Sequence, residues 1–107
     1  MGTGADPVGT LEVALNHTAR LLDRDPKLAV EQANEILKVA PRHPAATLML
    51  GVAQRRGGQH EAALSTLKVV ADAQPNWAAA QYEYGLTLAE TGQTSPAIAS
   101  LDRKSVV

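Results

Sequence analysis

The chain has 107 residues, 45% of them apolar, which is enough for one small globular domain. It contains no cysteine, which excludes disulfide frameworks and cysteine-ligated zinc sites. Ten basic and eleven acidic side chains leave a net charge of −1, so no long-range field attracts nucleic acid or anionic lipid. No apolar run approaches the roughly 18 residues that a membrane span requires. We therefore expect neither nucleic acid nor a membrane as a partner.

The first segment, residues 1–9, combines glycines with a proline and shows no hydrophobic period. Such composition predicts a flexible N-terminal arm ahead of a folded unit at residues 10–107. The segment also lacks the basic and apolar regions of a secretory signal. We therefore expect a cytoplasmic protein, with the periplasm as the alternative compartment.

From residue 10 onward, apolar residues recur at helical spacing, which predicts an all-α domain without β-structure. Asp25-Pro26 and Ser95-Pro96 each place a capping oxygen before a proline, a pattern typical of helix starts. Gly58 and Gly92 separate periodic stretches, so we predict turns there. The expected helices cover residues 10–22, 26–40, 44–56, 60–73, 77–90 and 95–104.

Two of these helices carry apolar residues on one face, as expected of helices that pack on a core. The predicted core residues are Val30, Ala33, Ile36 and Leu37, and then Ala63, Leu64, Leu67 and Val70. Trp77 lies at a junction between helices, where we expect it to pack against the preceding helix. Gly51 and Gly85 lie inside helices, where glycine is unfavourable, so we expect a neighbouring helix to approach closely at both.

The chain also matches itself at a constant offset of 34 residues. The offset pairs Gly51 with Gly85, Gly58 with Gly92, Ala63 with Ala97, and Leu67 with Leu101. A period of this length is typical of helix-turn-helix solenoids, in which each unit buries its apolar face against a neighbour. The repeats then cover about 10–43, which is degenerate, 44–77, and 78–107, which is truncated.

Leu50-Gly51, Ala63, Leu67 and Pro75 resemble the tetratricopeptide repeat signature. The chain departs from this signature where Thr47 and Gln81 replace its Trp, and where Gln54 and Leu88 replace its Tyr. The resemblance implies a right-handed α-solenoid of about three helical hairpins. It also implies that the first helix of each hairpin lines a concave groove, which binds a peptide or helix of a partner protein.

The resemblance assigns nine residues to this groove: Leu48, Met49, Val52, Arg55, Arg56, Tyr82, Glu83, Leu86 and Glu90. Leu48, Val52 and Leu86 are equally compatible with packing between neighbouring helices. Tyr82 and Met49 favour the groove, because tyrosine offers a flat ring with a polar tip and methionine adapts to irregular partners. Arg55-Arg56 can either hold an anion or interact with the negative end of their own helix.

No residue pattern predicts catalysis, a metal site or a cofactor. His17, His43 and His60 lack the i, i+4 spacing of a helical metal site, so we expect surface or helix-capping roles. Glu31 and Glu35 share a helix face, which we interpret as a solvated outer surface. The chain is therefore predicted to be a binding scaffold rather than an enzyme.

In the sequence as given, the last predicted helix lacks a following helix, so we expect that the array either continues in a longer protein or buries the face of this helix in an oligomer. The apolar residues Ile98, Leu101 and Val106 predict self-association, most simply as a homodimer. The alternative function is an N-terminal accessory or oligomerisation module of a larger bacterial enzyme. Gln74-Pro75-Asn76-Trp77 and Tyr84-Gly85-Leu86 resemble repeat regions that precede sulfotransferase domains in some bacterial proteins.

Overall fold

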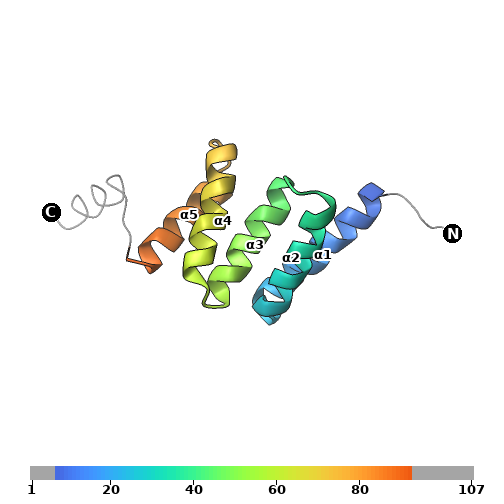
Figure 1. Ribbon diagram of the computed structural model, residues 1–107, viewed down its shortest axis with the longest axis horizontal. Coiled ribbons are helices and arrows are strands. Elements are labelled where there is room, and N and C mark those ends of the chain that lie inside the picture. Colours follow the sequence, from blue (N-terminus) through green and yellow to red (C-terminus); the bar gives the residue numbers. More distant parts are fainter. Residues whose placement is uncertain (1–6, 93–107) are drawn as a thin grey trace.

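The computed structural model describes residues 7–92 of the chain, which form five helices and no strand (Figure 1). The helices are α1 (Pro7–Arg24), α2 (Pro26–Val39), α3 (Pro44–Arg56), α4 (His60–Ala73) and α5 (Ala78–Glu90). Their bounds lie close to the predictions for the first five helices. The sixth expected helix, residues 95–104, lies outside the described residues, as does the predicted start at Ser95-Pro96.

Helix α1 begins earlier than the sequence predicted. Its first residue is Pro7, so residues 7–9 belong to the helix rather than to a flexible arm. Proline suits this position because its fixed φ matches the first helical turn and its missing N–H has no helical partner there. The expectation for the arm therefore concerns residues 1–6, which lie outside the described part.

Side chains that precede α2 and α3 cap these two helices. The Leu28 N–H donates to Asp25 Oδ1 over 3.2 Å, and Pro26 follows the cap as predicted. At α3, the Ala46 N–H donates to His43 Nδ1 over 3.3 Å. The capping role expected for one or more of the histidines is thus confirmed at His43.

Tight turns end α3 and α5 at the two predicted glycines. Gly58 and Gly92 have φ of 86° and 76°, in the left-handed region that favours glycine. After α3, the Gln59 N–H donates to the Gln54 carbonyl over 2.8 Å, which closes the helix end around Gly58. The turn at Gly58 reverses the chain, so that α4 packs against α3.

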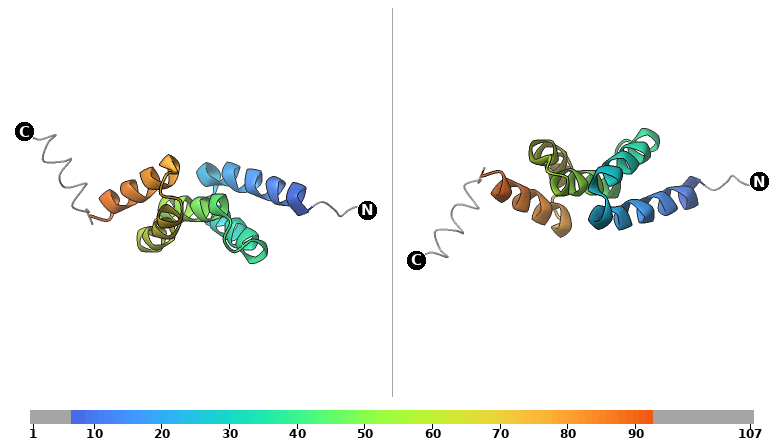
Figure 2. Two further views of the ribbon diagram at one scale, coloured as in Figure 1. Left: turned by 90° about the horizontal axis from the view of Figure 1, so that it is seen from above. Right: turned by 90° about the horizontal axis from the view of Figure 1, so that it is seen from below.

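The helices form two layers. Figure 2 shows α1 and α5 on one side of α3, and α2 and α4 on its other side. Consecutive helices pack against each other, and α3 also contacts α1 and α5 directly. This arrangement is an all-α solenoid of helical hairpins, in agreement with the sequence prediction.

Small and branched apolar residues fill the space between the layers. The buried residues of α2 and α4 are Ala29, Ala33, Ile36, Ala63, Leu67, Val70 and Ala71. The predicted stripes are therefore confirmed at Ala33, Ile36 and the centre of α4, whereas Val30, Leu37 and Leu64 are only partly buried. Trp77 packs against the cluster that contains Leu67, as predicted.

The two helical glycines differ in their surroundings. A Cβ atom added to Gly51 would lie 2.5 Å from Leu67 Cγ, far inside van der Waals contact. The absence of a side chain thus permits the close approach of α3 and α4 that the sequence predicted. A Cβ added to Gly85 meets no atom within 4 Å, so the described residues show no close approach there. The counterpart of Leu67 one repeat later is Leu101, which lies outside the described part.

Candidate protein-binding face

The nine predicted groove residues come from α3 and α5, two of the three helices in the layer that we call the concave layer (α1, α3 and α5; Figure 2). Tyr82 on α5 is 65% exposed, although it is a large aromatic residue. Met49 on α3 is partly buried and keeps some accessible surface. Both residues can therefore contact a partner in this conformation.

The aliphatic members of the set are more enclosed. Val52 is 6% exposed, so it offers a partner little surface. Leu48 is partly buried and packs against the cluster of Ala63, Leu67, Val70 and Ala80. Leu86 is also partly buried. The alternative role of packing between helices is thus the main role of Val52 and part of the role of Leu48.

The structure brings three of the predicted charged residues into one cluster. Arg55 Nη2 lies 2.8 Å from Glu83 Oε1, and Arg55 Nη1 lies 3.5 Å from Glu90 Oε2. The side chains of Arg55 and Glu83 are 12% and 19% exposed, so solvent screens their ion pair only partly. His60 on α4 joins the cluster, with its Nε2 3.5 Å from Glu90 Oε1. This cluster connects α3 to α5.

Arg56 makes the corresponding connection on the other side of α3. Its guanidinium pairs with the Asp23 carboxylate near the end of α1. The Asp23 side chain is 85% exposed, so this pair is close to solvent and is worth at most about 1 kcal/mol. Arg55 and Arg56 together connect the middle helix of the concave layer to both of its neighbours.

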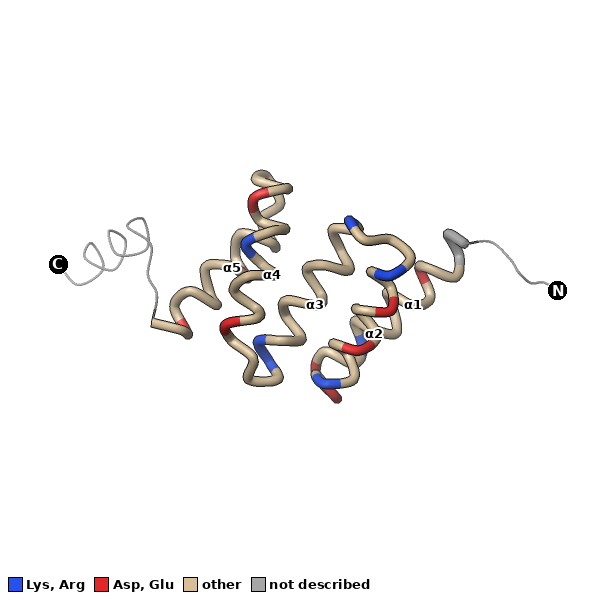
Figure 3. Tube along the Cα trace, in the orientation of Figure 1, with Lys and Arg blue, Asp and Glu red and all other residues tan. Residues whose placement is uncertain are grey.

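The two arginines therefore hold carboxylates of their own chain. The sequence left open whether they hold an external anion, and in this structure their guanidinium groups are directed to acidic residues of α1 and α5. Figure 3 shows positions of basic and acidic residues interspersed over the described helices, although α3 has only arginines and α5 only glutamates as charged residues. The charged residues that the resemblance assigns to the groove, Arg55, Arg56, Glu83 and Glu90, are thus paired within the chain.

One polar atom of the cluster lacks a partner. Arg55 Nε is buried and has no hydrogen-bond acceptor among the described residues. An unpaired buried donor on a charged group costs free energy, but the two Nη atoms of the same guanidinium are paired. The cluster therefore stabilises the helix arrangement by less than a fully satisfied network would.

The carboxylates and histidines of residues 7–92 are spread over the helices. Within these residues, no three His, Cys, Asp or Glu side chains gather in a group that could hold a metal ion. Glu31 is exposed, and Glu35 pairs with Lys38 over 2.9 Å, as expected of a solvated helix surface. None of the described helices is long and apolar enough to cross a membrane.

Sequence reasoning missed one feature, a pocket beside Thr47 that we call the Thr47 pocket. Its lining residues are Pro41, Arg42, Pro44, Thr47, Val69, Val70, Ala73 and Gln74. The sequence feature that could have indicated this pocket is Thr47, a small residue at a position where the repeat signature has Trp. The pocket shares no residue with the predicted groove.

Comparison with known proteins identifies the type of repeat. The model of the family described as tetratricopeptide repeat matches residues 19–77, more than half of the chain. Comparisons with curated proteins and with solved structures gave no match. The resemblance to repeat regions of sulfotransferases thus has no support from them. Tetratricopeptide repeats generally mediate protein–protein interactions and are typically not enzymatic. From the family match and the helical hairpins together, the chain belongs to the tetratricopeptide repeat family.

Proposed function

We propose that this chain is a non-enzymatic binding module whose concave layer holds a peptide or helix of a partner protein. The observation that carries this proposal is the exposure of Tyr82 on α5, with 65% of its surface open to solvent. Large aromatic residues in such positions often anchor protein partners, because they bury much area with little loss of side-chain freedom.

The other aromatic residues support this assignment by contrast. Trp77 and Tyr84 are partly buried and pack against the core cluster of α4 and α5. Core packing thus accounts for their presence in the sequence, whereas it does not account for Tyr82. Met49 on α3 adds an adaptable apolar surface in the same layer.

The ion pairs of α3 support the proposal in a second way. Arg55 and Arg56 connect α3 to α5 and to α1, so they restrain the spacing of the three helices that form the concave layer. A binding surface with its helices already in place loses less conformational entropy when a partner binds. The role that we propose for these charges is therefore to pre-organise the surface, while apolar contacts provide most of the affinity.

A peptide selected on this chain from a random display library provides the test. Its affinity for the unmodified chain, for Tyr82→Ala and for Glu31→Ala would be measured by isothermal titration calorimetry. Tyr82→Ala should weaken binding by about 1 kcal/mol or more, which is at least a fivefold change, whereas Glu31→Ala should have little effect. Met49→Ala should weaken binding in the same direction as Tyr82→Ala. Equal losses at Tyr82 and Glu31 would show that the concave layer is not the binding face.

Self-association through the segment that carries Ile98, Leu101 and Val106 stays a prediction, because these residues lie outside the described part. Three apolar side chains per protomer, buried against a second copy, would each contribute roughly 1.5–3 kcal/mol. The contributions together would offset much of the entropic cost of association.

A further inference from the structure

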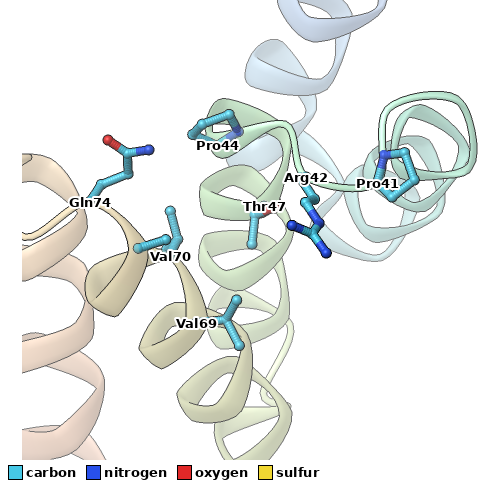
Figure 4. Close-up of a pocket in the computed structure, with 8 residues that line it drawn as sticks. Pro41, Arg42, Pro44, Thr47, Val69, Val70 and Gln74 are labelled. Carbon is cyan, nitrogen blue, oxygen red and sulfur yellow. The ribbon is translucent and has the colours of Figure 1, made fainter.

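The Thr47 pocket lies where the loop between α2 and α3 meets the last turns of α4, as Figure 4 shows. Its volume is about 300 Å³, at the lower end of the range of small-molecule sites. A pocket of this size suits one amino-acid side chain and part of its backbone rather than a large cofactor.

Thr47 contributes a short side chain to the wall of the pocket. Its hydroxyl donates to the carbonyl of His43, the residue that caps the same helix, over 2.9 Å. The counterpart one repeat later is Gln81, whose Nε2 reaches the preceding helix and donates to the Ala71 carbonyl over 2.8 Å. Gln81 thus reaches the helix that precedes it, whereas Thr47 forms no side-chain hydrogen bond to a neighbouring helix among the described residues.

The walls of the pocket are mainly apolar. Val70 forms part of its floor and is 2% exposed, while Val69 beside it is 63% exposed. In Figure 4 these two residues of α4 face Thr47 of α3. A large branched residue that is open to water next to a pocket gains free energy when an apolar group covers it.

One cation lies at the edge of this apolar surface. Arg42 is exposed and lies beside Thr47 in Figure 4. It forms no hydrogen bond or ion pair with any other residue between 7 and 92. This distinguishes Arg42 from Arg55 and Arg56, whose guanidinium groups bind acidic side chains of their own chain. A planar guanidinium without a partner is well suited to bind an external carboxylate through two parallel hydrogen bonds.

We propose that the Thr47 pocket binds an aliphatic side chain of a partner protein that is followed by an acidic residue. The aliphatic group would fill the space beside Thr47 and cover Val69, and the carboxylate would pair with Arg42. The start of α3 at Pro44 lies on the same side and adds a partial positive charge. The end of α4 forms the opposite wall and carries a partial negative charge, so the acidic group belongs on the Arg42 side.

Three capped dipeptides test the two parts of this proposal separately. Acetyl-Leu-Asp-amide carries both groups, acetyl-Leu-Asn-amide lacks only the charge, and acetyl-Ala-Asp-amide lacks the large aliphatic group. Two-dimensional amide NMR spectra of the isotope-labelled chain would report the site and the affinity. The Leu-Asp peptide should shift the amides around Thr47 and Val70, with weak affinity as expected for so small a ligand. The Leu-Asn peptide should bind about two- to fivefold more weakly, as expected for an exposed ion pair.

Substitutions in the chain provide the matched controls. Thr47→Trp should fill the pocket and abolish the shifts, whereas Thr47→Ser keeps both the space and the hydroxyl and should leave them unchanged. Arg42→Gln removes an exposed charge without touching the core, so it should preserve the fold and make the affinities of the Leu-Asp and Leu-Asn peptides equal. This second variant keeps the test decisive if Thr47→Trp does not fold.

Several results would overturn the proposal. The aliphatic part would be wrong if the Ala-Asp peptide bound as well as the Leu-Asp peptide. The charged part would be wrong if Arg42→Gln left the preference for Leu-Asp unchanged. Shifts confined to the surroundings of Tyr82, or no shifts at all, would show that the Thr47 pocket is not a binding site. The amide shifts report on individual residues. An absence of binding at the Thr47 pocket can therefore be distinguished from an absence of binding at the concave layer.

Discussion

Substitution of the two helical glycines by alanine separates the effect of a close helix contact from that of helix propensity. Alanine is more favourable than glycine inside a helix by about 0.8–1.0 kcal/mol, and this gain applies equally to Gly51→Ala and Gly85→Ala. The new Cβ at Gly51 would overlap with the fully buried Leu67 side chain, whereas the Cβ at Gly85 meets no described atom. Overpacking of this kind costs about 1–3 kcal/mol.

The two variants should therefore change stability in different directions. We expect Gly85→Ala to raise the free energy of unfolding by up to about 1 kcal/mol, and Gly51→Ala to leave it unchanged or lower it by up to about 2 kcal/mol. The difference between them, about 1–3 kcal/mol, measures the contact with Leu67 alone. Urea unfolding followed by circular dichroism at the helical band would give both values by linear extrapolation.

A double substitution checks the origin of the difference. Leu67→Ala alone should cost about 2–5 kcal/mol, because it leaves a cavity in the core. In the Gly51→Ala background the same change should cost less, since it also relieves the overlap, and the two effects should be non-additive by 1 kcal/mol or more. Equal stabilities of Gly51→Ala and Gly85→Ala, or strict additivity in the double variant, would refute the assignment of Gly51 as a contact glycine.

Arg55→Ala should lower the free energy of unfolding by about 1–3 kcal/mol, because it leaves a partly buried carboxylate of α5 without its partner. Arg56→Ala, whose partner is exposed, should cost at most about 1 kcal/mol, and equal losses in urea unfolding would contradict this difference. Asp25→Ala should cost about 1 kcal/mol by removing the cap of α2, and an unchanged melting temperature would argue against that cap. Leu101→Glu should dissociate a self-associating chain, whereas Glu31→Lys should not. Sedimentation that shows a monomer of the unmodified chain at tens of micromolar would rule out the homodimer.

Much of the secondary structure could be predicted because its signals are local. Asp25-Pro26 predicted a helix start, and the positive φ of Gly58 and Gly92 matches the turns expected from glycine between periodic stretches. The start of α1 was placed too late, at residue 10 instead of Pro7, because the first residues of the helix show no hydrophobic period. Composition alone could not distinguish a polar helical turn from an arm.

The candidate site was only partly predictable. The repeat pattern assigned Tyr82 to an exposed surface and left open whether Val52 is buried, and the structure places these residues at 65% and 6% exposure. The pattern could not show that Arg55 is paired with acidic residues of α5, because any arginine in a basic pair has the same sequence signal. Nor could it show the Thr47 pocket, which lies between two segments that are distant in the chain, residues 41–47 and 69–74.

The sequence by itself determined the helices, their order and the repeat of 34 residues, because hydrophobic period, caps and turn glycines act between residues a few positions apart. Only the tertiary structure decided which charges are paired, and that Arg42 has no partner among the described residues. Arg55 and Glu83 are 28 positions apart, and their contact exists only because α3 and α5 lie in the same layer at a particular spacing. Whether an arginine reaches a carboxylate on another helix depends on how the helices pack. For this reason Arg55 forms an ion pair that stabilises the fold, whereas Arg42 forms no ion pair within residues 7–92.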